Sequence, residues 1–483
     1  MKRLFVFLML ATISICADVS AGAKQWATTC GGSNADRACC VQKTEDGGYI
    51  IAGSTSSFSA GENDLWLLKF DSNNDISWQK TYGGSGNDYA VDIRQVQHQL
   101  GVSPSSTGAG GYIVVGTTYS FGAGESDIWV LRLDDDGNIL WQKSYGGSSF
   151  DFGTCVRQIA DGYIVAGNTY SYGAGECDIW ILQLDGDGEI IHEKAYGGTG
   201  FDWSFHLQQT PDGQYLIAGD TFSFGAGEND FWVLKLDKAG EIAWQKTYGG
   251  SSFDWAFRLQ QTETGGSIIA GNTFSFGAGE DDIWILELDN QGEIAWQKTY
   301  GGASFDWPAS IQPISGGGYV VTGGSYSFGA GEDDLWVFEL DSQGNVAWQK
   351  TYGGEKSDYA TSIQPVDDGF IVVGSTSSFG AGKDDLLVLK LDNHGEIPDC
   401  RSILDCNASV SDTLTIAAET DCRVESTLAT ITNTTVLPQD SSAKIRNEFC
   451  GIGKGNFNDD GRRLNTKGQV LFFSVVSTCP FRL

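Results

Sequence analysis

A Gly-Gly pair recurs at the same place in seven copies of one repeated segment, at intervals of 52, 63, 51, 52, 52 and 52 residues. The copies begin at Gly31, Gly83, Gly146, Gly197, Gly249, Gly301 and Gly353. A fixed period of this size marks a supersecondary unit that cannot bury its apolar surface alone, so the copies must stack into a solenoid, an array or a propeller. The repeat therefore constrains the architecture far more than the chemistry.

Each repeat reads as four short strands. In the copy that follows Gly249, we predict strands over Phe253–Thr262, Ser267–Ser275, Asp282–Asp289 and Glu293–Tyr300, which are rich in Ile, Trp, Phe and Thr and show no helical period. Short turns with Gly join the first pair and the last pair, and a longer loop joins the middle pair. We therefore predict an all-β protein, a seven-bladed β-propeller of four-stranded blades.

The two ends of the repeat region complement each other. Lys24–Cys30 resembles the fourth strand of later repeats, as at Trp244–Tyr248, yet it precedes any first strand. The seventh repeat instead meets Pro398 where its fourth strand should begin. We predict that the N-terminal strand closes the ring and leaves no open edge between blade seven and blade one.

Three regions follow from this division: a signal peptide at residues 1–23, the propeller at 24–397, and a C-terminal region at 398–483. The signal peptide is indicated by Lys2 and Arg3 ahead of the short apolar stretch Leu4–Ile15. We expect a secreted, periplasmic or cell-surface protein with no integral membrane segment after cleavage. Acylation of Cys16 is the alternative, although Ile15 stands where a small residue is preferred.

The C-terminal region is rich in Ser and Thr and carries five of the ten cysteines beyond the signal peptide. The ten are Cys30, Cys39, Cys40, Cys155, Cys177, Cys400, Cys406, Cys422, Cys450 and Cys479. An even number in an exported chain is typical of disulfides, and we expect a small cysteine-containing module here. Asn456–Gly461 resembles the start of a calcium loop, but Lys467 stands where the bidentate acid belongs, which favours a simple turn.

The formal net charge is −32. So acidic a chain disfavours nucleic acid and anionic membranes as partners and favours cations, basic proteins or neutral ligands. A monomer is expected. No cofactor is predicted, with Ca2+ as the alternative.

An aspartate stands four positions after the second glycine of each of these pairs. We expect it on the face of the ring that carries both the interblade loops and the long loops. These residues are Asp36, Asp88, Asp151, Asp202, Asp254, Asp306 and Asp358. One hypothesis is a cation held by the seven carboxylates at the mouth of the ring. The other is that each aspartate caps the Gly-Gly turn of its own blade. An acid also recurs in the long loops, from Glu62 to Glu332, with Lys383 as the exception.

Aromatic residues flank this aspartate in the middle blades only, which breaks the symmetry of the ring. The triplets proposed as a ligand site are Phe201, Asp202, Trp203, Phe253, Asp254, Trp255, Phe305, Asp306 and Trp307, with Phe150 and Phe152 in the same positions of blade three. Aromatic faces beside carboxylates suit neutral sugar rings, with the tryptophans stacking and the aspartates accepting hydroxyls. The alternative is that these rings wedge between blades.

The repeated segment Asp282–Gly302, followed by Gly317–Gly323, resembles the SBBP-type β-propeller repeats of exported bacterial and archaeal proteins. That resemblance implies secretion and a propeller and transfers no catalytic residue. Leu288–Trp296 is also similar to the tryptophan-docking motif of quinoprotein propellers, whose vicinal disulfide draws attention to Cys39 and Cys40. On a regular strand these two side chains would point to opposite faces.

We therefore predict a non-catalytic binding or cell-surface interaction module for a neutral glycan or a protein partner. The alternative is a secreted propeller enzyme, either quinoprotein-like or active on polysaccharides. None of the four histidines stands in a recognisable catalytic or metal-binding pattern. His206, at the innermost-strand position matched by Cys155 and Arg258, is the one histidine expected near the axis.

Overall fold

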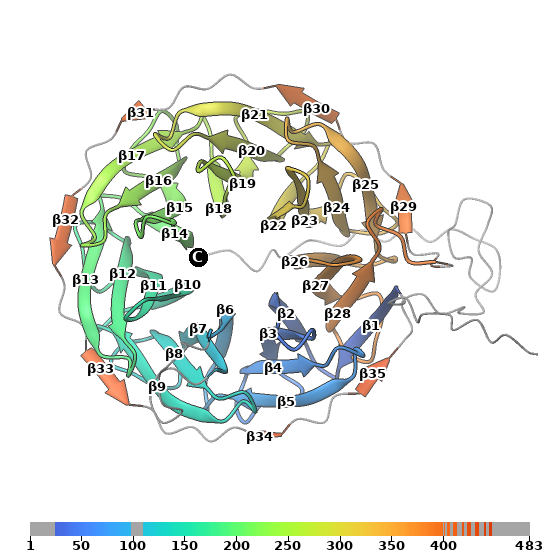
Figure 1. Cartoon of the computed structure of the whole chain (residues 1–483), viewed down its shortest axis with the longest axis horizontal. Helices are drawn as coiled ribbons and strands as arrows, with labels where there is room; N and C mark the ends of the chain where they lie inside the picture. The colour runs from blue at the N-terminus through green and yellow to red at the C-terminus, as the bar shows by residue number, and fades with distance from the viewer. Residues whose placement is uncertain are drawn as a thin grey trace, which may run out of the picture.

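The computed structural model describes residues 25–97 and 110–398, Cys400, and the backbone of seven short strands between residues 403 and 446. Seven antiparallel sheets stand around one axis, which confirms the predicted all-β propeller (Figure 1). The described residues contain no helix. Accordingly, this part of the chain offers no helix long and apolar enough to cross a membrane.

We number the blades 1 to 7 from the first complete repeat. The innermost strands are β2 (Asp36–Lys43), β6 (Asp88–Gln95), β10 (Asp151–Ile159), β14 (Asp202–Gln209), β18 (Asp254–Gln261), β22 (Asp306–Ile314) and β26 (Asp358–Val366). The second strands are β3 (Tyr49–Thr55), β7 (Tyr112–Thr118), β11 (Gly162–Thr169), β15 (Tyr215–Thr221), β19 (Ser267–Thr273), β23 (Gly318–Ser325) and β27 (Gly369–Thr376). Predicted and observed bounds of blade 5 agree to within two residues.

The third strands are β4 (Asp64–Phe70), β8 (Asp127–Leu133), β12 (Asp178–Asp185), β16 (Asp230–Leu236), β20 (Asp282–Leu288), β24 (Asp334–Leu340) and β28 (Asp385–Leu391). The fourth strands are β5 (Ile76–Tyr82), β9 (Ile139–Gly146), β13 (Ile190–Gly197), β17 (Ile242–Tyr248), β21 (Ile294–Gly301), β25 (Val346–Tyr352) and β1 (Trp26–Gly31). Strand β1 pairs antiparallel with β28, from Trp26 opposite Lys390 to Cys30 opposite Leu386. The predicted closure of the ring by the N-terminal strand is therefore confirmed.

A fifth strand lies outside each blade. These strands are β29 (Ile403–Asp405), β30 (Ser409–Asp412), β31 (Ala418–Glu419), β32 (Arg423–Ser426), β33 (Thr430–Asn433), β34 (Gln439–Asp440) and β35 (Lys444–Arg446), paired with blades 6, 5, 4, 3, 2, 1 and 7 in that order. These seven strands thus lie around the rim in the reverse order of the blades (Figure 1). The predicted signal peptide, Cys16 and the remainder of the cysteine-containing region lie outside the described residues.

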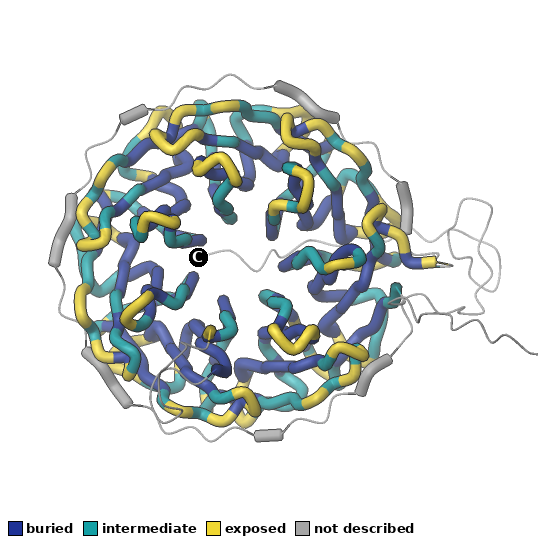
Figure 2. Tube along the Cα trace, viewed as in Figure 1, coloured by how far each residue is buried: buried dark blue, intermediate teal, exposed yellow. Residues whose placement is uncertain are grey.

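The apolar core lies between blades. The second and third strands are the most deeply buried elements (Figure 2), and the tryptophans of the third strands have no exposed surface. These residues are Trp66, Trp129, Trp180, Trp232, Trp284 and Trp336. Phe231 of blade 4 lies 4.7 Å from Trp284 of blade 5, ring centroid to ring centroid. Each blade therefore buries its apolar faces against its neighbours, as the repeat period required.

In blades 1 to 6, a tyrosine near the end of the fourth strand forms a hydrogen bond to the next blade. Tyr248 donates a hydrogen bond of 2.6 Å to the carbonyl of Gly292, whose φ of 76° places it in the left-handed region. Tyr82, Tyr145, Tyr196, Tyr300 and Tyr352 make the same bond. At the seam between blades 7 and 1, Cys30 replaces the tyrosine and Asn74, with a φ of 67°, replaces the glycine. The closing seam therefore lacks this fastening.

Candidate functional site

The seven aspartates that follow the Gly-Gly turns do not converge. Each is fully buried at the start of its innermost strand, and Asp254 accepts hydrogen bonds from the backbone N–H of Gly250 (2.9 Å) and from Ser275 Oγ (2.8 Å). The other six accept the same backbone bond. Within the described residues, no three His, Cys, Asp or Glu side chains are grouped as metal ligands would be. The geometry favours the turn-capping hypothesis over the cation hypothesis.

This burial corrects one part of the predicted ligand site. Asp202, Asp254 and Asp306 were expected to accept hydroxyl groups of a sugar, but they are 0% exposed. Their carboxylates already bond the turns of their own blades. A ligand on the loop face must therefore find its polar contacts elsewhere.

A second aspartate in every repeat was missed in the sequence. Asp282 begins the third strand and accepts backbone hydrogen bonds from Ala278 (2.6 Å) and Gly279 (3.2 Å). A Cβ on Gly301 would lie 1.6 Å from Asp282 Oδ1 and 3.0 Å from Asp306 Oδ2, so only glycine fits between the two carboxylates. Burial is the main cause that raises the pKa of Asp282 and of its counterpart Asp334, to about 7 for Asp334. The sequence feature that could have indicated these residues is the aspartate that follows the long loop in every repeat.

Aromatic rings form a continuous arc over blades 3 to 6 on the loop face. We define the aromatic arc as Phe150, Tyr170, Phe201, Phe222, Phe253, Phe274, Phe305 and Tyr326. Each ring contacts the next at a centroid distance between 6.1 and 6.5 Å, with interplanar angles between 60° and 78°. Edge-to-face packing is the favoured arrangement of aromatic pairs. The predicted Phe201, Phe253 and Phe305, together with Phe150 at the same position of blade 3, belong to this arc.

The other four rings of the arc were not predicted. They follow the second strands directly, and in blade 4 Phe222 donates its backbone N–H to the carbonyl of Phe201 at 2.8 Å. The arc crosses the blade boundaries, as the wedge hypothesis expected, yet Phe222, Phe305 and Tyr326 remain 45%, 40% and 46% exposed. An exposed apolar array of this extent is typical of an interaction surface.

The predicted tryptophans support the arc from its inner side. Trp255 lies 5.6 Å from Phe274 and 5.8 Å from Phe253, and Trp307 lies 5.6 Å from Tyr326. Both tryptophans, like Trp203, are partly exposed. They widen the aromatic surface toward the axis.

The arc is interrupted over blades 7, 1 and 2, where the same positions are mostly polar. Ser357 and Ser377 occupy them in blade 7, Ala35 and Ser56 in blade 1, and Asn87 and Tyr119 in blade 2. Tyr119 is 42% exposed and contacts the ring of Tyr89. The loop face therefore has one aromatic side and one polar side.

Exposed acids line the outer edge of the arc. Asn229, which follows Glu228, forms an isolated backbone bridge with Phe253. Cys177, which follows Glu176, forms the same kind of bridge with Phe201. Glu176, Glu228, Glu280 and Glu332 are all exposed. The predicted acidic loop face thus exists, with these glutamates, in place of the buried aspartates, next to the rings.

A second cluster of chemistry-bearing residues lies on the innermost strands, around the axis. Each innermost strand has a β-bulge three residues after its aspartate, such as that between Ala38 and Cys40 in β2. Because of this bulge, Cys39 and Cys40 do not point to opposite faces as predicted. Their sulfur atoms lie 3.2 Å apart, and both are free thiols.

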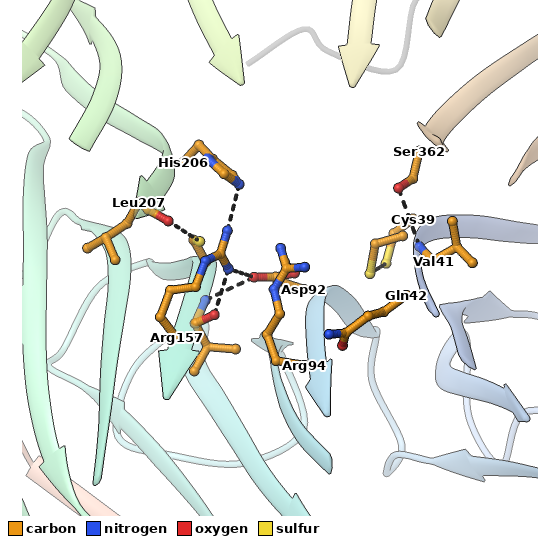
Figure 3. A network of polar contacts seen from close by, with 12 residues as sticks. Cys39, Val41, Gln42, Asp92, Arg94, Arg157, His206, Leu207 and Ser362 are labelled. Carbon is orange, nitrogen blue, oxygen red and sulfur yellow. Dashed lines mark hydrogen bonds and ion pairs between the residues drawn. The ribbon is translucent and has the colours of Figure 1, made fainter. Parts of the chain in front are cut away.

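Three blades contribute to an ion-pair network on one side of the axis (Figure 3). Arg157 of β10 lies 2.7 Å from Asp92 of β6 and 2.7 Å from Nε2 of His206 of β14. Asp92 also contacts Arg94 at 3.0 Å and accepts the backbone N–H of Val156 at 3.1 Å. Arg94 and Arg157 lower the pKa of Asp92 against the effect of its burial, which keeps the carboxylate ionised.

His206 is the neutral member of this network. Burial, followed by the charges of Arg157, Arg258 and Arg94, lowers the pKa of His206 well below its ordinary value. Because a guanidinium can only donate, Nε2 must accept from Arg157 and the proton must lie on Nδ1. The sequence had marked this histidine but gave no sign of its partners.

Arg258 of β18 adds a third cation. Its guanidinium donates to the carbonyl of Phe257 at 3.0 Å, and no carboxylate among the described residues forms an ion pair with it. The nearest opposite charge that acts on it is that of Asp92, which raises the pKa of Arg258 against the larger effect of burial.

No family model matches this chain, and no curated protein matches it. Similar solved structures include the WD40 β-propeller domain of Doa1, which is 10% identical over 76% of this chain and 96% of that chain, with a TM-score of 0.42. Sqt1 of Chaetomium thermophilum, bound to the N-terminus of ribosomal protein L10, is 12% identical over 71% and 84%, with a TM-score of 0.39. A putative gluconolactonase is 12% identical over 64% and 93%, with a TM-score of 0.32. These likenesses are to the propeller fold alone, and the SBBP-type assignment stays a prediction.

Proposed function

We propose that this propeller is a non-catalytic binding module whose aromatic arc binds a neutral glycan. The observation that carries the proposal is the unbroken series of eight partly exposed rings across four blades. Sugar rings present C–H faces that pack on aromatic faces, and an extended row of rings matches a chain of several sugars. The glutamates beside the arc would accept hydrogen bonds from the sugar hydroxyl groups. The buried aspartates would not take part in binding.

The net charge supports a neutral ligand over an acidic one. The chain carries −32, and exposed glutamates border the arc. A uronate or sulfated polymer would meet the same sign of charge at short range, and repulsion would oppose binding. An exported location, as the predicted signal peptide at residues 1–23 implies, would bring the arc into contact with extracellular glycans.

Binding to an array of neutral and acidic oligosaccharides tests this proposal. We expect the purified protein to retain neutral oligomers of four or more sugars and to leave the acidic ones unbound. Substitution of Phe222 by Ala should then weaken binding by about 1–3 kcal/mol, the loss typical of an interface hot spot. Titration calorimetry with the best neutral oligomer would measure the change.

Tyr119→Ala is the matched control, because Tyr119 is equally exposed at the same repeat position but lies outside the arc. We expect this variant to bind as the parent does. Failure of the parent to bind any neutral oligosaccharide would reject the glycan ligand. Equal losses in both variants would place the site elsewhere on the loop face and equally contradict the proposal. A protein partner would then be the remaining prediction.

A further inference from the structure

We propose that the arginine cluster around the axis is a binding site for a small dianion, either a divalent oxyanion or a dicarboxylate. We define the axial cluster as Arg94, Arg157, Arg258, Asp92 and His206. Its members come from four consecutive blades, β6, β10, β14 and β18. The site is separate from the aromatic arc, and the two proposals can fail independently.

The charge of the cluster points to an anion. Three guanidinium groups stay protonated in proteins, Asp92 supplies one negative charge, and His206 is neutral. The sum is two positive charges, held close together inside a protein whose formal charge is −32. Like charges at short separation in a poorly hydrated setting repel strongly unless a counterion joins them. A ligand with two negative charges would neutralise the cluster.

The donors of the cluster are incompletely used. Among the residues that the structure describes, Arg258 donates to one backbone carbonyl alone, and the buried Nε of Arg94 has no hydrogen-bond partner. Buried polar groups are normally satisfied, so the buried Nε of Arg94 calls for an acceptor. The free donors of the partly exposed Arg258 can turn to the same acceptor. Two guanidinium groups from different blades can approach one oxyanion or carboxylate together, and such charge-assisted bonds are strong.

The cluster is also reachable. The side chains of Arg94 and Arg157 are 27% and 15% exposed, and Arg258 is likewise partly exposed. They lie on the innermost strands, which stand around the axis. The remaining axial positions of this register are uncharged: Cys40, Cys155, Ser310 and Ser362 share the position of Asp92, and Gln42, Gln208, Gln260, Gln312 and Gln364 share that of Arg94. The positive charge is thus confined to one side of the ring.

Sulfate and succinate are suitable probes, because they separate the tetrahedral oxyanion from the dicarboxylate. Titration calorimetry at constant ionic strength, with chloride as the reference salt, would measure binding. We expect saturable binding of one or both probes at about one per chain. Arg258→Gln should raise the Kd roughly 10- to 100-fold, the change expected for a lost charge-assisted hydrogen bond. Arg94→Gln, on another blade, should do the same.

Arg37→Gln is the control, since Arg37 also lies on an innermost strand but is paired with Asp384 at 2.6 Å. We expect this variant to bind as the parent does. The pKa of His206, followed by NMR of labelled histidine, should rise when the probe binds, because a bound anion offsets the arginine charges. A general effect of the added salt on the stability of the protein would not produce a binding curve that saturates at one probe per chain. Absence of saturable binding, or parental affinity in both Arg258→Gln and Arg94→Gln, would overturn the proposal.

Discussion

Nη2 of Arg157 lies 2.7 Å from Nε2 of His206, although the two residues belong to different blades. The contact requires a neutral imidazole, because a protonated ring would place two donors face to face. Arg157 simultaneously holds Asp92 of a third blade. One guanidinium therefore joins three consecutive blades at the axis.

We predict that His206 stays neutral through the pH range in which an ordinary histidine titrates, around 6.5. Replacement of Arg157 by Gln removes the nearest positive charge and should raise the pKa of His206. NMR of labelled imidazole would show this, with His206→Gln used to assign the signal among the four histidines of the chain. An unchanged pKa in Arg157→Gln would show that Arg157 does not contribute to the neutral state of His206.

We predict that mild acid stabilises the ring. Burial raises the folded-state pKa of Asp64 and Asp127 to about 6 and that of Asp334 to about 7, above the ordinary value of 3.8. A carboxyl group with a raised pKa contributes stability that is full below its unfolded pKa and is lost as the pH rises through its folded pKa. The melting temperature should therefore fall between pH 5 and pH 8.

Asp334→Asn tests this assignment, because an amide cannot ionise. The variant should show a weaker decline of melting temperature with rising pH than the parent does. Asp289→Asn is the control, since Asp289 caps an exposed turn by accepting the N–H groups of Gln291 and Glu293. His206 acts in the opposite direction, because a lowered pKa in the folded state reduces stability as the pH falls below about 6.5. A melting temperature that rises from pH 5 to pH 8 would contradict the aspartate prediction.

We predict that Asn74→Gly strengthens the closing seam. Asn74 has a φ of 67°, a conformation that glycine adopts without the steric cost that other residues carry. The gain should be about 0.5–1 kcal/mol, measured as a higher midpoint of urea unfolding. The reverse change, Gly292→Asn at an internal junction, should lower the midpoint, because its Cβ would lie 3.0 Å from the ring of Trp244. If both variants shifted the urea midpoint in the same direction and by the same amount, the predicted difference between the closing seam and the internal junction would be wrong.

The sequence was sufficient to predict the interior of each blade. The strand bounds in blade 5 follow from a period of about 52 residues and from local turn chemistry. The closing strand, predicted at Lys24–Cys30 and observed at Trp26–Gly31, follows from the same repeat. The triplets also marked Phe201, Phe253 and Phe305. Each of these features depends on residues that are close in sequence, so a single repeat carries the information.

The sequence by itself determined the number of blades, their strands and the face that carries the loops, because periodicity and turns are local properties. Tertiary structure decided which side chains meet. Ring closure brings Asp92, Arg157 and His206, which are 65 and 49 residues apart along the chain, to one side of the axis. A bulge turns Cys39 toward Cys40, and contacts across blade boundaries make separate rings into one arc. These relationships depend on the packing of one blade against the next, which no single repeat encodes.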